Sequence, residues 1–88
     1  MRTFTASRLA ADVLFPDRIE IDDNKIVYYK GAIIGYSSTV VQRASISSVR
    51  IDSRILFADL IIETSGGKKI IVEGLLKGEA RIAFGMLQ

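Results

Sequence analysis

The chain has 88 residues, of which 49% are hydrophobic, and it contains neither cysteine nor histidine. These absences exclude disulfide bonds and thiolate metal sites, and they remove the commonest general base and the commonest transition-metal ligand. The net charge is +2, with acidic and basic residues interspersed. No apolar run approaches the ~20 residues of a membrane span, and the N-terminus lacks the apolar core of a signal peptide. We therefore expect one cytoplasmic domain over residues 1–88, with no cofactor.

The first half of the chain predicts short strands. Residues 1–14 sustain neither a helical nor a strand period, so only a short extended segment is expected there. Asp17 to Lys30 predicts a hairpin, because Ile19 and Ile21 alternate with charged residues. Its turn is Asp22-Asp23-Asn24-Lys25, since Asp and Asn favour turns. Further strands are expected over Tyr36–Gln42 and Ser45–Ser53.

The stretch from Phe57 to Gly74 predicts the central hairpin, because two isoleucine-rich arms flank Gly66-Gly67. With these glycines as a two-residue turn, Ser65 faces Lys68 and Glu63 faces Ile70. Both faces of the hairpin are then apolar, so both need a cover. The candidate interface comprises Leu60, Ile61, Ile62, Ile70, Ile71 and Val72. Its outward set is either Ile61, Ile70 and Val72 or Leu60, Ile62 and Ile71, and a second subunit is the expected cover.

After Gly74 the apolar period becomes helical, which predicts an amphipathic helix over Lys77–Leu87. Its apolar stripe consists of Leu76, Ala80, Ala83, Phe84 and Leu87, and Phe84 is expected to plug the open end of the barrel. The predicted fold class is mainly β. It comprises a bent antiparallel sheet, or partly open barrel, of six to seven strands capped by one C-terminal helix.

Several fold motifs resemble those of bacterial pleckstrin-homology-like (PH-like) domains. They are Phe15-Pro16-x-x-Ile19-x-Ile21, Ile46-x-x-Val49-x-Ile51, Phe57-Ala58-Asp59-Leu60-x-Ile62-x-Thr64-x-Gly66-Gly67 and Gly74-Leu75-x-Lys77-x-x-Ala80. The resemblance implies a seven-stranded, partly open barrel closed by a C-terminal helix. Many eukaryotic pleckstrin-homology domains bind inositol phosphates through basic residues that flank the first hairpin turn. The turn at 22–24 is acidic here, so no phosphoinositide is expected.

Other candidate sites have simpler interpretations. Asp22, Asp23 and Asn24 lack the alternating ligands of a calcium loop, so a turn is favoured. A basic patch of Arg50, Arg54, Lys68 and Lys69 is better explained as solvated strand charge, and nucleic acid is not expected. Stacking by Tyr28, Tyr29 and Tyr36 is less favoured than rim packing. Paired acids are Glu20 with Asp22 and Glu63 with Glu73, but nothing around them indicates a catalytic pocket.

The sequence thus favours a non-catalytic protein-interaction or scaffolding module that forms a homo-oligomer. One alternative is a membrane-surface adaptor that uses Ile33 and Ile34 in the apolar Gly31–Gly35 loop. Another alternative is a small ligand-binding barrel.

Overall fold

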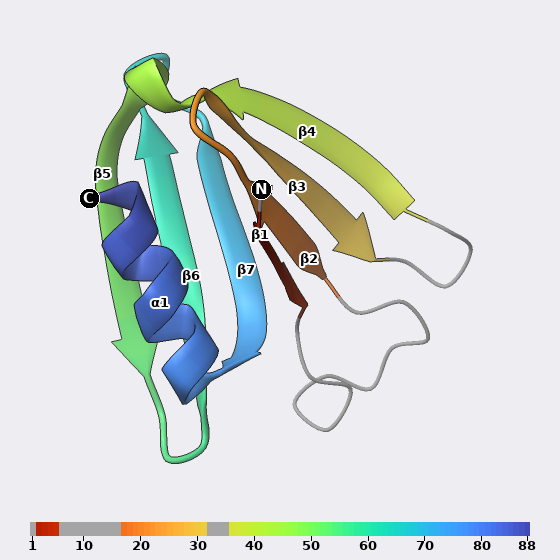
Figure 1. Ribbon diagram of the computed structural model, residues 1–88, viewed down its shortest axis with the longest axis vertical. Helices are drawn as coiled ribbons and strands as arrows, with labels where there is room; N and C mark the ends of the chain where they lie inside the picture. Colours follow the sequence, from red (N-terminus) through yellow and green to blue (C-terminus); the bar gives the residue numbers. More distant parts are fainter. Residues whose placement is uncertain (1, 6–16, 32–35) are drawn as a thin grey trace.

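The computed structural model describes residues 2–5, 17–31 and 36–88, and it places seven strands and one α-helix there (Figure 1). The elements in chain order are β1 (Arg2–Thr5), β2 (Arg18–Ile21), β3 (Lys25–Gly31), β4 (Tyr36–Gln42), the 3-10 helix η1 (Arg43–Ser45), β5 (Ile46–Ser53), β6 (Phe57–Thr64), β7 (Lys69–Leu76) and α1 (Lys77–Leu87). The predicted fold class is confirmed, and the bounds of α1 are those that the helical period predicts. The N-terminal residues 1–14, which show no periodic pattern, contribute β1.

The strands form two antiparallel sheets, one of order β1-β2-β3-β4 and one of order β5-β6-β7. Strand ladders within the described residues do not join the two sheets, so they are not closed into a barrel. In the described ladders the edge strands are β1 and β4 in the larger sheet and β5 and β7 in the smaller one. Helix α1 packs on β5, β6 and β7 and also contacts β1, so it covers the opening between β5 and β1.

The core lies between the two sheets and α1, and aliphatic side chains dominate it. Alternation in β2 and β3 places Ile19, Ile21 and Ile26 on the inner face, where they are fully buried. The largest fully buried side chains are Phe4, Ile19, Ile21, Ile26, Leu60, Ile62, Leu75 and Val72. Phe4 shows that β1 belongs to the core despite its short length.

The β6–β7 hairpin has a different register from the predicted one. Ile62 pairs with Ile70 and Ile61 with Ile71, because the turn has three residues rather than two. The Gly67 N–H donates to the Thr64 carbonyl, and Gly67 takes a positive φ of 85°. This is a type I turn closed by a glycine bulge. The predicted two-residue turn was therefore wrong, and the predicted face sets were wrong with it, because a one-residue slip exchanges the faces.

A second irregularity lies near the end of β7. Ala58 pairs with Leu75, but Leu60 pairs with Val72, so β7 carries one extra residue at this point. Gly74 adopts a φ of 76° there, and its N–H donates to Asp59 Oδ1 at 3.1 Å. The bulge reverses the alternation of β7, so Leu75 is buried and Leu76 is exposed.

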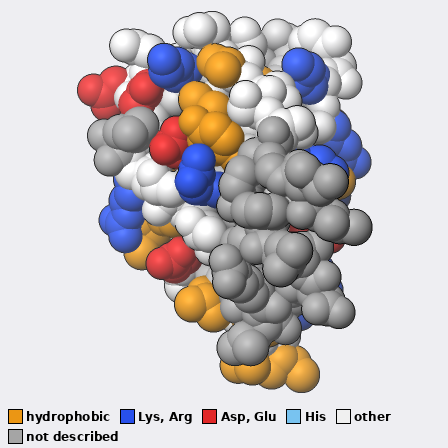
Figure 2. Space-filling view, turned by 90° about the vertical axis from the view of Figure 1, so that its right-hand side faces the viewer, with side chains coloured by type: hydrophobic (Ala, Val, Ile, Leu, Met, Phe, Trp, Pro, Cys, Tyr) orange, Lys and Arg blue, Asp and Glu red, His pale blue; other side chains and the backbone are white. Residues whose placement is uncertain are grey.

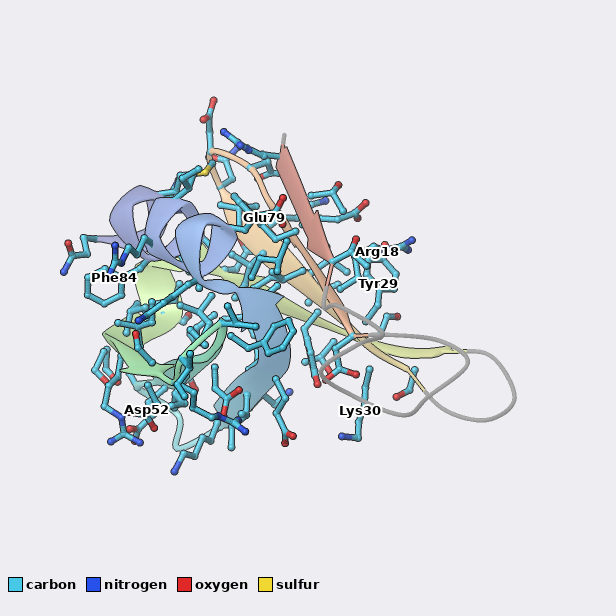
Figure 3. The ribbon with its side chains drawn as sticks, turned by 90° about the horizontal axis from the view of Figure 1, so that it is seen from below. Arg18, Tyr29, Lys30, Asp52, Glu79 and Phe84 are labelled. Atoms are coloured by element: carbon cyan, nitrogen blue, oxygen red, sulfur yellow. The ribbon has the colours of Figure 1, made fainter. Side chains whose placement is uncertain are left out.

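Helix α1 contacts the core mainly through Ala80, Ala83 and Leu87, which are buried. Phe84 is half-buried and lies on the β5 side of the helix, at the rim of the molecule (Figure 3). The prediction that Phe84 plugs an open end was therefore wrong. Small alanines instead let the helix approach the sheets closely.

Candidate interaction surfaces

The predicted hairpin interface is mostly part of the monomer core. Leu60, Ile62, Ile70 and Val72 share the inner face and are buried. Ile61 lies on the outer face but is also buried, at 4% exposure. Its cross-strand neighbours are Arg50 and Ile71. Ile71, at 37% exposure, is the one residue of the six that remains accessible.

The two most exposed large hydrophobic side chains among the described residues lie at one end of the domain, where β5 turns into β6. Ile55 and Leu56 form the tip of this hairpin and are 91% and 67% exposed. The Lys77 N–H donates to the Leu56 carbonyl, which holds the start of α1 beside the tip. Leu76, the neighbouring residue, is 51% exposed. Hydrophobic atoms are visible at the lower end of the molecule in Figure 2. Ile55, Leu56 and Leu76 define what we call the apolar end.

Arg54 borders the apolar end. Its N–H donates to the Phe57 carbonyl, and its guanidinium forms an ion pair with Asp59 at 2.6 Å. Asp59 also accepts from the Gly74 N–H, so one carboxylate ties together the hairpin and the β7 bulge. The charge of Arg54 is therefore balanced locally.

The second surface is the opening between the free edges of β4 and β7, which we call the β4–β7 seam. Two hollows of about 350 and 470 Å³ follow it, and Lys68 lines both. The first lies between Tyr28, Lys30 and Thr39 on one side and β7 on the other. The second lies between β4 and the β6–β7 turn. The two hollows share Lys68 in their linings, and we refer to them together as the groove of the seam.

The structure divides the predicted basic patch. Arg50 forms an ion pair with Asp52, with 3.6 Å between Nε and Oδ1, and Arg54 forms the one with Asp59. Lys68 and Lys69 lie elsewhere, along the seam. Lys30 joins them there, and sequence reasoning missed it. The available signal was its position on β3: it follows Ile26 and Tyr28 at every second residue, on the inward face.

The acidic segment 22–24 forms a turn, as predicted. Asp22 Oδ1 accepts the backbone N–H groups of Asn24 and Lys25 at 2.8 and 2.9 Å. These two hydrogen bonds lower the pKa of Asp22 below its ordinary value. This turn joins β2 to β3 and is the second connection of the fold. The first connection falls at 6–16, outside the described residues. The acidic turn at 22–24 is therefore not the first turn, and its charge gives no argument against phosphoinositide binding at the first turn.

Two of the predicted rim tyrosines donate hydrogen bonds to carboxylates. Tyr28 Oη donates to Asp17 Oδ2 and Tyr29 Oη to Glu20 Oε1, each at 2.9 Å. Burial, followed by the bond to Asp17, raises the pKa of Tyr28 well above its ordinary value. Arg18 lies over the Tyr29 ring, with its Cζ 4.2 Å from the ring centroid (Figure 3).

The carboxylates considered for catalysis are distributed over the surface. Glu20 is engaged by Tyr29 and Asp22 by the turn. Glu63 lies opposite Lys69 in the β6–β7 ladder, and Glu73 lies further along β7. Among the described residues, no three acidic side chains come together in a way that could hold a metal ion.

One predicted feature, the apolar loop at Gly31–Gly35, has no described counterpart. Ile33 and Ile34 fall outside the described residues, so the Gly31–Gly35 loop stays a prediction. The described part of the chain also has no helix that is both long and apolar enough to cross a bilayer.

Comparison with models of protein families finds a match. A family model described as "Bacterial PH domain" matches residues 3–88, which is nearly the whole chain. No curated protein and no solved structure matches the sequence. The matched region spans both sheets and the C-terminal helix, and the chain belongs to the bacterial PH domain family.

Proposed function

We propose that this domain is a non-catalytic protein-interaction module that self-associates through the apolar end. The observation that carries the proposal is the exposure of Ile55, Leu56 and Leu76 beside one another. Full burial of a leucine or isoleucine side chain yields about 1.5–3 kcal/mol relative to exposure. Adjacent exposed aliphatic residues are typical of interaction sites.

The occupant we infer is a second copy of the chain. A closed dimer brings the same patch of each copy together, so the contact does not propagate. The ion pair between Arg54 and Asp59 places both charge signs beside the patch. A two-fold contact can therefore set the cation of one copy near the carboxylate of the other. An anionic membrane would instead be favoured by a cluster of unbalanced basic residues.

The test is the molar mass in solution, measured by size-exclusion chromatography with light scattering over a range of concentrations. We expect the wild-type protein to approach a dimer mass and the double variant Ile55→Ser/Leu56→Ser to remain a monomer. The matched control is Val40→Ser/Ile82→Ser, which removes two exposed aliphatic side chains elsewhere and should leave the mass unchanged. A wild-type monomer at every concentration would contradict self-association.

The membrane alternative is separated by co-sedimentation with vesicles of phosphatidylcholine and phosphatidylglycerol. We expect no co-sedimentation. Binding that disappears in Ile55→Ser/Leu56→Ser would assign the apolar end to a lipid surface and would contradict its assignment to a second copy.

A further inference from the structure

The β4–β7 seam differs in character from the core beside it. On the inward face of β3, burial decreases from Ile26 and Tyr28 to the exposed Lys30. On β4 it decreases from Val41 through Thr39 to Ser37. Tyr28 pairs with Thr39 and Lys30 with Ser37. The inward face of this sheet therefore becomes polar where the seam opens, as expected for a surface in contact with water.

The walls of the groove include free strand edges. In the described ladders β4 pairs only with β3, and β7 pairs only with β6. Both edges leave backbone N–H and C=O groups that another extended chain can use. β7 has eight residues, so its edge is about 26 Å long at 3.3 Å per residue. Two hollows that share Lys68 and lie along such an edge suit an extended peptide better than a compact small molecule.

The charge along the groove is mostly positive. Lys30, Lys68 and Lys69 line it, and all three are exposed. The ion pairs among the described residues involve only Arg50, Arg54 and their aspartates, so these lysines form none there. Glu73 is the one carboxylate among the residues that line the two hollows. Three ammonium groups along one groove favour an anionic occupant.

We propose that the β4–β7 seam binds an acidic, extended peptide segment, which adds as a strand to the free edge of β7. Main-chain hydrogen bonds to β7 supply affinity, as in other strand additions. Lys30, Lys68 and Lys69 select carboxylate side chains, and the exposed part of Ile71 provides an apolar contact. This surface is separate from the apolar end, so the inference does not depend on self-association.

The probe is a fluorescein-labelled peptide of alternating glutamate and valine, as long as the eight residues of β7. Fluorescence anisotropy should show saturable binding that weakens as salt is added. A peptide with lysine in place of glutamate should not bind. Amide resonances of ¹⁵N-labelled protein should shift over Lys69–Glu73 and Thr39–Gln42. The Ile55→Ser/Leu56→Ser variant should bind equally well.

The double variant Lys30→Glu/Lys68→Glu should weaken binding by about ten-fold or more, because two favourable charge contacts become repulsive. The control Lys77→Glu/Arg81→Glu makes the same change in net charge on α1, away from the groove, and it should alter affinity far less. Equal losses in the two variants would show only a general attraction and would overturn the site.

A peptide N-methylated at alternate residues tests the strand addition itself, because it loses donors while it keeps its charge. Equal affinity of the methylated and unmethylated peptides would overturn pairing with β7. Absence of saturable peptide binding would overturn the proposal. So would displacement of the peptide by soluble inositol hexakisphosphate together with unchanged amide resonances in β7, because the groove would then bind a small polyanion.

Discussion

The two openings between the sheets differ in what lies in them: a helix covers one, and a groove remains at the other. Between β5 and β1, α1 fills the opening with Ala80, Ala83 and Leu87, and the residues beneath it are buried. Between β4 and β7, the inward-facing positions become Thr39 and Lys30, and a groove remains. Figure 3 shows Phe84 and Lys30 on opposite sides of the molecule. The sequence thus seals one opening with apolar residues and leaves the other polar.

This difference separates residues that stabilise the fold from residues available for binding. A chain of 88 residues has little core to spare, since a domain of this size buries only about 60% of its unfolded surface. Truncations under α1 should therefore lower the free energy of unfolding, whereas truncations in the seam should change it little. The following experiments test that contrast.

The largest effect is expected at Leu87, which is buried under the covered opening. Leu87→Ala should lower the free energy of unfolding by about 2–4 kcal/mol, because it leaves a cavity between α1 and the sheets. Thr39→Ala in the open seam should change it by less than about 0.5 kcal/mol. Urea denaturation measures both values. Similar losses in the two variants would mean that the openings do not differ.

A smaller effect is expected at Arg43, which connects the β2–β3 turn to the end of α1 beside the covered opening. Its guanidinium donates to the Asp22 carbonyl at 3.1 Å and to the Met86 carbonyl near the end of α1. Arg43→Gln should cost about 1.5–3 kcal/mol, as for hydrogen bonds to charged groups. Arg50→Gln, which removes an exposed ion pair, should cost at most about 1 kcal/mol. Equal stability of the Arg43 variant and the wild type by thermal melting would contradict this role.

The smallest effect concerns Tyr28, at the border of the open seam. The pKa of its phenol is raised above the ordinary value of 10.0 by burial and by Asp17. The native state therefore holds this proton more tightly than the unfolded state does. Stability is fully present below pH 10.0 and should fall as the pH rises above that value. Tyr28→Phe should reduce this alkaline loss in pH-dependent urea denaturation. An unchanged alkaline slope would contradict the burial of the phenol.

Sequence periodicity predicted the elements better than the contacts between them. Strict alternation in β2 and helical spacing in α1 depend on local burial, and both were confirmed. The register of β6 and β7 depends on the φ of Gly67, and an adjacent pair of glycines permits either a two-residue or a three-residue turn. The predicted hairpin interface depended on the two-residue choice, and five of its six residues are buried in the monomer.

The candidate surfaces were harder to predict because they depend on irregularities and on distant pairings. Ile55 and Leu56 lie between two strands, where exposed aliphatic residues have no periodic signal. Lys30 and Lys68 line the same hollow only because β3 lies across the seam from the turn that precedes β7. Burial of Phe4 similarly required knowledge of the β1–β2 pairing. Local patterns do not encode these long-range relations.

The extra residue at Gly74 changes which side chains of β7 point toward the core. Up to Val72 the even-numbered side chains are internal, and after the bulge the odd-numbered Leu75 takes that place. A chain of identical composition without this bulge would direct Leu76 inward and would lose one third of the apolar end. The backbone conformation of Gly74 thus determines whether Leu76 is exposed at this end of the domain. Loss of the bulge would leave Ile55 and Leu56 exposed at this end but would direct Leu76 toward the core.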